Sequence, residues 1–422
     1  MPCRSPCLVV ALLAICLQLQ VVRIQVERHL WKAFVRGLPQ SHVPGTSGTS
    51  GIIVVGGRDP RRASGDGWEV TTVADYTLDA LLLLASLRRT GCMLPVELWH
   101  NHDLRLLGAE AERAAELLSM HAGSVQFRDI SATPIGRFVK GHQLVPYVMT
   151  QSFFDEFLVL DADNVVLVDP TELFRSAAFR ETGAVFWADY DARIVPVESP
   201  LWQVFEVEYR HLNKLDTGQM LVNRSRHWAA VALAEFLSRE RSDFYFPHSN
   251  FDCELFSFSW LALDRPFRTV VDMQLAGWAL NKDAFCGHTY VQMHPDRADH
   301  AVFAHRSLYK FSAVFDDGQA WTAIKRNTSM WGFKRLFTEG IWPGCRCAKV
   351  RGVTHTCQDV IFEGVDTSPP TERLLQELAA IERELLALRA QLADGELALR
   401  PRWYEPLARF LAAKAAGPPP GG

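Results

Sequence analysis

Short apolar runs alternate with longer segments of helical pattern between residues 51 and 340. Apolar runs bounded by turn residues are typical of buried strands, and a longer leucine-rich segment is typical of a buried helix. The alternation predicts an α/β domain whose mostly parallel central sheet is covered by helices on both faces. The expected strands are 51–55, 68–74, 95–100, 126–130 and 157–160, and the expected helices are 77–89 and 145–154.

A different period governs residues 371–399. Leucine and isoleucine recur there at spacings that alternate between four and three, at Leu374, Leu378, Ile381, Leu385, Leu388 and Leu392. This spacing predicts a C-terminal heptad helix with one apolar seam. Because about three heptads are marginal for an isolated coiled coil, packing on the domain and pairing as a homodimer are both open.

The first 25 residues carry the pattern of a signal peptide or signal anchor. The apolar run from Leu8 to Leu17 follows Arg4; its length suits the core of a signal peptide and is short for a membrane span, which needs about 20 residues. Cleavage after Cys16 and a short uncleaved anchor are both open. Either reading places the protein in the secretory pathway, at the Golgi membrane with a lumenal catalytic domain or free in the lumen.

The other segments outside the α/β domain have the composition of connections. Residues 26–50 are expected to form a stem or linker, and residues 400–422 a flexible tail, because both contain stretches rich in Gly and Pro. Residues 341–370 are expected to be a loop segment in which Cys357 bridges to Cys345 or Cys347, with a zinc site as the weaker alternative. Two glycosylation sequons, at Asn223 and Asn327, fit a secretory compartment.

Composition narrows the function classes. The chain has 422 residues, of which 48% are hydrophobic and 22% charged, with a formal net charge of -4. These values exclude a disordered chain and a multi-span membrane protein. The mild acidity argues against a nucleic-acid partner, which normally requires a concentrated basic surface.

The most informative segment is the strand pattern at 157–160, which runs into Asp161, Ala162 and Asp163. Two carboxylates that close together at the end of a strand can hold Mg²⁺ or Mn²⁺ together with phosphate oxygens. A cation held there could stabilise the diphosphate that leaves a sugar nucleotide. This D-x-D pattern therefore favours a metal-dependent glycosyltransferase.

Two other readings of this segment stay open. An aspartate after a hydrophobic strand is also the nucleophile of haloacid-dehalogenase-type phosphatases, where Asp161 would be phosphorylated. The strands that precede it argue against this reading, since that motif normally lies on the first strand of its domain. A catalytically silent sugar-binding or scaffold protein is the second alternative.

Five segments in one order resemble the fungal-type Golgi α-1,3-mannosyltransferase family. They are residues 87–100, 158–164, 216–228, 285–295 and 303–310. The resemblance spans roughly residues 50 to 315. It implies a GT-A-like nucleotide-sugar-binding domain that takes GDP-mannose and a divalent metal, and transfers mannose to a glycan acceptor with retention at the anomeric carbon.

The resemblance also implies roles for individual residues. Asp161 and Asp163 would be metal ligands, with His305 at the end of a late strand as the third ligand. An imidazole beside carboxylates favours Mn²⁺ over Mg²⁺. The catalytic positions would be Asp216, Gln219 and Asp252, and Glu254 competes with Asp252 for the last role. The donor-binding positions would be Lys140, Asp161, Gly218 and Lys310, together with a base-binding turn for which Gly56 and Gly57 compete with Asp75 and Tyr76.

Overall fold

The fold is described from a computed structural model of the whole chain. It describes residues 6–39, 49–56, 58–59, 74–75, 77–100, 125–139, 141–189, 195–249, 253–279, 284–307, 310–311, 319–326, 349–350, 353–354, 361–363 and 367–393. Several predicted positions lie outside these residues: Gly57, Tyr76, Lys140, Asp252, Asn327, Cys345, Cys347 and Cys357.

The core of the protein is a seven-stranded sheet in the order β10-β8-β9-β6-β1-β4-β5. Four of its six pairings are parallel, and only β9 runs against its neighbours β6 and β8. This confirms the predicted α/β class with a mostly parallel central sheet. The strands are β1 (Ser50–Val55), β4 (Val96–His100), β5 (Val125–Asp129), β6 (Glu156–Asp161), β8 (Ala184–Ala188), β9 (Leu215–Asn223) and β10 (Arg268–Val270).

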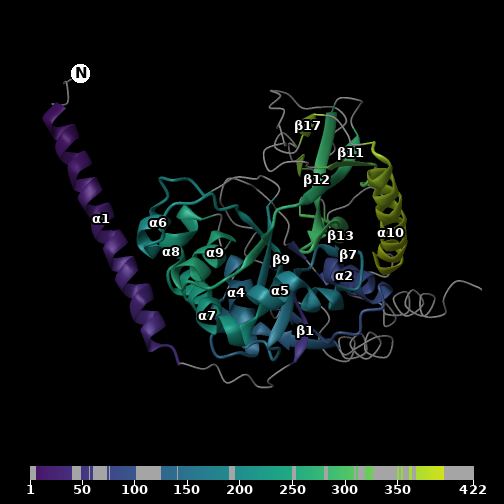
Figure 1. Cartoon of the computed structure of the whole chain (residues 1–422), viewed down its shortest axis with the longest axis horizontal. Coiled ribbons are helices and arrows are strands. Elements are labelled where there is room, and N and C mark those ends of the chain that lie inside the picture. Colours follow the sequence, from purple (N-terminus) through teal and green to yellow (C-terminus); the bar gives the residue numbers. More distant parts are fainter. Residues whose placement is uncertain are drawn as a thin grey trace, which may run out of the picture.

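A second, antiparallel sheet stands against the end of the first (Figure 1). Its order is β14-β11-β12-β13-β7, and β17 pairs with β12. Because β7 follows β6 after only two residues, the turn at Ala162 and Asp163 joins the two sheets. These strands are β7 (Asn164–Val166), β11 (Met273–Ala279), β12 (Ala284–His294), β13 (Arg297–His305), β14 (Ala323–Arg326) and β17 (Ile361–Glu363); two small hairpins pair β2 (Arg58–Asp59) with β3 (Ala74–Asp75) and β15 (Lys349–Val350) with β16 (Val353–Thr354).

Helices cover both faces of the central sheet. Alternate residues of β6 point to opposite faces, so Phe157 and Val159 pack against α4, α7 and α9, whereas Leu158 and Leu160 belong to a cluster with α2 and α5. All four are fully buried, which explains the unbroken apolar run. The helices are α2 (Thr77–Arg89), α4 (Leu144–Gln151), α5 (Ala177–Thr182), α6 (Pro200–Phe205), α7 (Arg224–Glu240), α8 (Ser242–Tyr245) and α9 (Cys253–Ala262).

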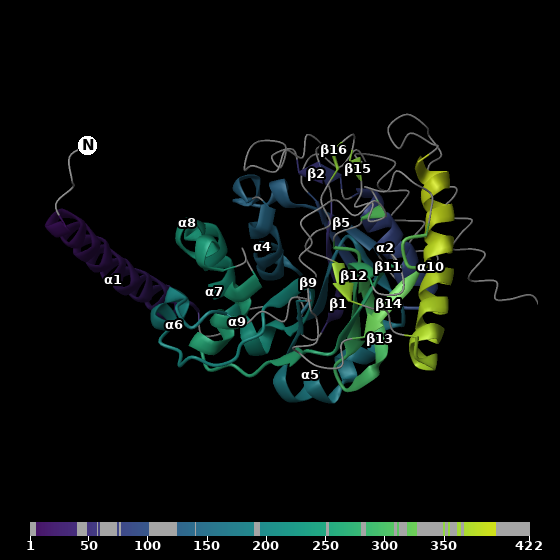
Figure 2. The same cartoon turned by 90° about the horizontal axis from the view of Figure 1, so that it is seen from above.

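The N-terminal helix α1 (Pro6–Gly37) is continuous through the predicted boundary at residues 25 and 26. Residues 26–37 of the predicted stem or linker are therefore helical. The reason is an inward-facing stripe: Ile24, Glu27 and Trp31 are buried against α6, α7 and α8, beside which α1 lies in Figures 1 and 2. Glu27 pairs with Arg241, and the Trp31 indole N–H donates to the Val204 carbonyl at 2.9 Å.

Within the described residues, none of the helices combines the length and the apolar content required to cross a membrane.

Truncating Trp31 tests whether α1 is part of the folded body. We expect Trp31→Ala to lower the free energy of unfolding by about 3 kcal/mol, because it removes a buried indole and its hydrogen bond. Urea denaturation measures the loss, and Leu19→Ala on the exposed side of the same helix is the matched control. Equal stability of the two variants would contradict the docking of α1.

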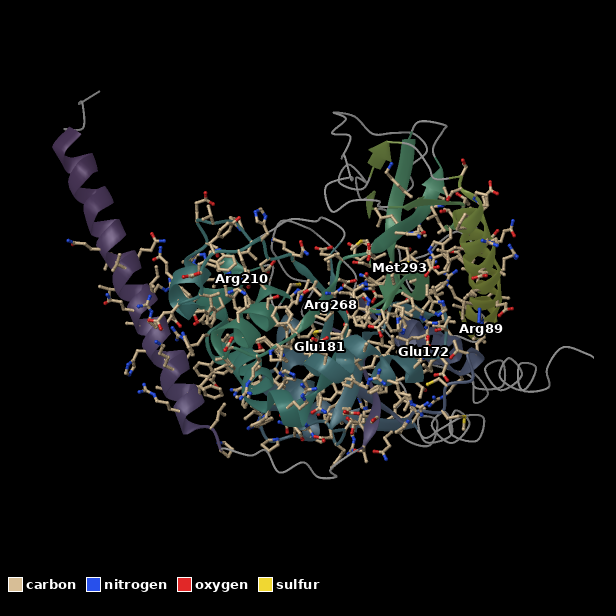
Figure 3. All side chains as sticks on the ribbon, in the orientation of Figure 1. Arg89, Glu172, Glu181, Arg210, Arg268 and Met293 are labelled. Carbon is tan, nitrogen blue, oxygen red and sulfur yellow. The ribbon has the colours of Figure 1, made fainter. Side chains whose placement is uncertain are left out.

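The heptad helix is present as α10 (Pro369–Ala393), and residues 394–399 of the predicted segment lie outside the description. Its seam is buried within the chain: Leu378, Leu385 and Leu388 join the core cluster that contains α2. Figure 2 shows α10 along the side of the domain, and Figure 3 labels Arg89 of α2, whose guanidinium lies 3.5 Å from the Glu384 carboxylate. The described part of the seam thus packs on the domain of the same chain.

A buried histidine makes the fold acid-sensitive. Desolvation lowers the pKa of His227 to about 4, although its Nε2 donates to the Thr182 carbonyl at 2.8 Å. A folded-state pKa below the unfolded value contributes stability above about pH 6.5, and this stability is lost as the pH falls toward 4.

Replacing His227 by Phe removes this titration but keeps the stacking on Trp260. We expect the variant to lose about 1 kcal/mol at pH 7, from the missing hydrogen bond, and to unfold with a flatter pH dependence between pH 6.5 and 4. Thermal unfolding across this range measures both effects. A variant with the wild-type pH slope would contradict the assignment.

Candidate metal and donor site

The D-x-D turn is fastened by one asparagine. Asn164 Nδ2 donates to the Asp161 carbonyl at 3.1 Å and to the Gly218 carbonyl at 2.9 Å, and its Oδ1 accepts from Gln219 Nε2 at 2.9 Å. Asn164 is buried, so these bonds hold the turn against β9 without competition from water. The turn therefore presents Asp161 and Asp163 in a defined geometry.

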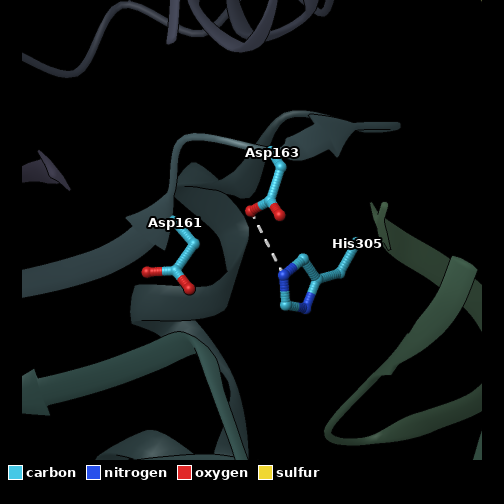
Figure 4. Close-up of side chains that lie close together, drawn as sticks. All are labelled: Asp161, Asp163 and His305. Atoms are coloured by element: carbon cyan, nitrogen blue, oxygen red, sulfur yellow. Dashed lines mark ion pairs between the residues drawn. The ribbon is translucent and has the colours of Figure 1, made fainter. Parts of the chain in front are cut away.

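His305 reaches this turn from the second sheet. It is the last residue of β13 and stands opposite Asn164 in the β13–β7 ladder. The Arg306 backbone N–H donates to the Asp163 carbonyl at 3.0 Å, which fixes the strand end beside the turn. His305 Nε2 lies 3.2 Å from Asp163 Oδ1 (Figure 4). One ligand atom each from Asp161, Asp163 and His305 lies within 4.8 Å of the others.

Asp216 contacts Nδ1 of His305, the ring nitrogen that does not contact Asp163. Its Oδ2 lies 2.9 Å from His305 Nδ1 and accepts from Gln292 Nε2 at 3.1 Å, while its Oδ1 accepts from the Gly218 N–H at 3.0 Å. A bulge brings it there, because the β8–β9 register jumps from Phe186–Met220 to Trp187–Asp216. A carboxylate on the second nitrogen orients a ligating imidazole and raises its basicity.

Gly218 is required by the same close packing. A Cβ at this position would lie 2.5 Å from His305 Cε1 and 2.6 Å from Nδ1. The position therefore accepts only a residue without a side chain as long as His305 keeps its orientation.

Opposite charges determine the ionisation of the cluster. Burial favours neutral forms, but Lys310 and His305 outweigh it and lower the pKa of Asp163, and Lys310 forms an ion pair with that carboxylate. Burial likewise opposes charge on His305, yet Asp216 and Asp163 raise its pKa well above the usual value. Burial, followed by repulsion from Asp163, raises the pKa of Asp161 to about 7.

These residues fit a divalent cation. Two carboxylates and an imidazole converge from two sheets, and Lys310 and His305 supply the positive charge that balances the carboxylates. Sequence reasoning expected His305 to be neutral near pH 7, but its two carboxylate neighbours favour the imidazolium. Binding of a cation by His305 would therefore release a proton.

The structure brings together six of the predicted site residues, Asp161, Asp163, Asp216, Gly218, His305 and Lys310. Gly56 follows β1, next to β6, and its N–H donates to the Trp99 carbonyl at 2.9 Å; because Val55 pairs with Asp161, this glycine flanks the turn. The backbone of Asp75 lies in the hairpin that pairs it with Arg58.

Two of the predicted catalytic residues form hydrogen bonds within the protein. Gln219 has no exposed surface and bonds Asn164, and Asp216 uses both oxygens within the protein. These bonds join Gln219 to the D-x-D turn through Asn164 and join Asp216 to His305, so both residues help to position the site. Their catalytic roles stay predictions.

Sequence reasoning missed two contributors, Gln292 and Arg306. Gln292 lies on β12 and bonds Asp216, whereas Arg306 reaches Asp163 through its backbone. Both belong to segments that carried the family resemblance, so the signal was present, but their partners are far apart in the chain. The side chain of Asn223, the predicted glycosylation site, forms hydrogen bonds within the fold. Its Nδ2 donates to the Glu156 carboxylate at 2.8 Å, and its Oδ1 accepts from the Arg226 backbone N–H and so caps α7.

Comparisons with known proteins show similarity to mannosyltransferases. Residues 50–209 match a family model described as "Mannosyltransferase putative". The chain is 27% identical over 202 residues to the α-1,2-mannosyltransferase MNN23 of Candida albicans, which covers 44% of this chain and 29% of the relative. It is 25% identical over 243 residues to the α-1,2-mannosyltransferase MNN2 of Saccharomyces cerevisiae, covering 48% and 37%.

These matches confirm the resemblance to fungal mannosyltransferases. The matched region spans about a third of the length of these curated relatives, which are named for α-1,2 rather than α-1,3 linkages. Among solved structures, the glycosyltransferase GlyE of Streptococcus pneumoniae aligns with a TM-score of 0.34 and 14% identity, over 52% of this chain and 45% of that chain. The galactosyltransferase LgtC aligns with a TM-score of 0.32 and 15% identity, over 50% and 70%.

Proposed function

We propose that this chain is a metal-dependent retaining glycosyltransferase that transfers mannose from GDP-mannose to a glycan acceptor. The observation that carries the proposal is the convergence of Asp161, Asp163 and His305 at the end of β6. It is supported by the mannosyltransferase family match that includes the D-x-D turn. The linkage, α-1,3 or α-1,2, is a separate question for product analysis.

Asp161, Asp163 and His305 would hold the cation, with Mn²⁺ favoured over Mg²⁺ because one ligand is an imidazole. A bound divalent cation supplies positive charge against the diphosphate of the leaving GDP. Asp216 would keep His305 Nε2 directed at the cluster by accepting the Nδ1 proton. Asp161, Asp163 and His305 would thus be preorganised for a cation, and that cation would bind the anionic diphosphate.

Lys310 and Gly56 are the described candidates for donor contacts. Lys310 would leave Asp163 when that carboxylate takes up a cation, and its ammonium would then bind a phosphate oxygen of the donor. Gly56 flanks Asp161 and allows the donor to approach the backbone closely. Gly57, Asp75, Tyr76 and Lys140 complete the proposed donor set.

The acceptor side would be formed near the start of α9. Asp252 lies immediately before this helix and remains the proposed catalytic carboxylate there. Glu254, in the first turn, is buried and lies 3.4 Å from Lys214 Nζ, so its charge is already balanced. Retention would then arise from attack of the acceptor hydroxyl on the face from which GDP departs.

The secretory pathway, with attachment to the Golgi membrane through the N-terminal part of α1, is the proposed location. It is supported by the targeting pattern in residues 1–25. Cleavage or retention of that segment is distinguished by N-terminal sequencing of the mature protein.

Hydrolysis of a panel of sugar nucleotides by the purified full chain tests the activity. We expect release of GDP from GDP-mannose that requires Mn²⁺ and is stimulated by an α-mannoside acceptor. Absence of hydrolysis for every donor, with or without acceptor, would overturn the proposal. Hydrolysis of p-nitrophenyl phosphate instead would favour a phosphatase with Asp161 as the nucleophile.

A further inference from the structure

Glu382 on α10 has the environment of a functional rather than a surface acid. It has no exposed area, although it lies on a helix whose other described charged side chains are exposed or half-buried. A carboxylate without solvent is costly unless it is paired and hydrogen-bonded. Its partners therefore indicate what it does.

The carboxylate of Glu382 binds three donors. Oε1 accepts from Arg306 Nη1 at 2.6 Å, and Oε2 accepts from the backbone N–H groups of Ala320 and Trp321 at 3.0 and 2.9 Å. The guanidinium of Arg306 lies 4.0 Å from the centre of the Phe311 ring and 5.0 Å from that of Trp321. Arg306 is thus held on three sides and is itself fully buried.

Arg306 is also part of the frame around the D-x-D turn. Its backbone N–H bonds the Asp163 carbonyl, it directly follows His305, and Lys310 lies four residues further along. The short segment that delivers both His305 and Lys310 to Asp163 is therefore anchored to α10 through one side chain.

We propose that Glu382 is a positioning residue for the metal cluster: it fixes Arg306, and through Arg306 it sets the placement of His305 and Lys310 against Asp163. This inference rests on the proposed function, since it assigns to α10 a part in binding the cation. It extends the site to a helix outside the segments that resemble the mannosyltransferases.

The test measures Mn²⁺ binding by the full chain, without donor or acceptor, by electron paramagnetic resonance of free Mn²⁺. We expect Glu382→Gln to weaken binding about tenfold, the loss typical of a disturbed supporting shell. The amide keeps the volume but cannot satisfy all three donors. The double variant Arg306→Met with Glu382→Met removes both buried charges together, so that neither is left unpaired, and we expect its binding to stay weak.

Glu384→Gln is the matched control, because it changes the same residue type on the same helix at the half-buried pair with Arg89. We expect this variant to bind Mn²⁺ as wild type does. A folded Glu382→Gln or double variant with an affinity within twofold of wild type would overturn the proposal. If neither variant folds, the pair is a requirement of the fold and the positioning role is rejected.

Failure of the inference and failure of the proposed function give different results. If wild type binds no Mn²⁺ and hydrolyses no sugar nucleotide, the proposed function fails and the positioning role fails with it. If wild type binds Mn²⁺ and the Glu382 variants bind it equally well, only the role of Glu382 is lost.

Discussion

Asp163→Asn should abolish Mn²⁺-dependent turnover and weaken Mn²⁺ binding by a factor of about 100 or more. The substitution keeps the size of the side chain but removes the negative charge that pairs with Lys310 and His305. An amide oxygen is a far weaker partner for a divalent cation than a carboxylate. Calorimetric titration with Mn²⁺ and measurement of GDP release check the two effects.

The same change should also destabilise the metal-free protein. The His305 imidazolium and the Lys310 ammonium would lose a shared counter-charge in a buried setting, which corresponds to about 3 kcal/mol. Asp169→Asn is the control, because Asp169 caps the following turn through a single oxygen and asparagine caps equally well. Wild-type turnover by Asp163→Asn would contradict the assigned site.

Gly218→Ala should weaken Mn²⁺ binding at least tenfold while the protein stays folded. The new methyl group would lie 2.5 Å from His305 Cε1, so the imidazole must turn away from Asp216. Loss of such a supporting hydrogen bond typically costs 10- to 100-fold in metal affinity, and the overpacking itself costs about 1–3 kcal/mol. Binding and thermal unfolding measured on one preparation separate these effects.

Gly37→Ala serves as the control for a glycine substitution, since a Cβ there meets nothing within 4 Å. It should bind Mn²⁺ as wild type does. Unchanged Mn²⁺ affinity in Gly218→Ala would contradict the inference that His305, in the orientation that Gly218 permits, is a ligand of the cation.

The predicted strands at 51–55, 95–100, 126–130 and 157–160, and the helices at 77–89 and 145–154, are confirmed to within a few residues. Most of them were predictable because they are buried and therefore carry a strong apolar pattern, whereas β5 is a partly exposed edge strand with a weaker pattern. The convergence of His305 on Asp163 came from family resemblance, since no pattern within one segment reports a pairing between β7 and β13. For the same reason the contacts of Asp216 with His305 and of Gln219 with Asn164 could not be predicted from a local pattern.

The two ends of the described chain illustrate a further limit. Residues 26–37 were expected to belong to a stem or linker, and no local pattern reports the partners that they have in the fold. Trp31 donates to Val204 on α6, and Glu27 pairs with Arg241 directly after α7, each more than 170 positions away. The heptad seam of α10 is compatible with any apolar partner, and only the fold shows that this partner is α2 and the neighbouring core.

The sequence by itself determined the α/β class, the strand that ends at Asp161 and the chemistry of two neighbouring carboxylates, because burial and local spacing leave a trace in the order of residues. Only the tertiary structure decided which side chains gather around these carboxylates: His305 and Lys310 contact Asp163, Asp216 contacts His305, and Glu382 on α10 binds Arg306, the residue after His305. The physical reason is that ion pairs and hydrogen bonds between distant segments depend on strand register and on the β9 bulge, and neither follows from a local pattern.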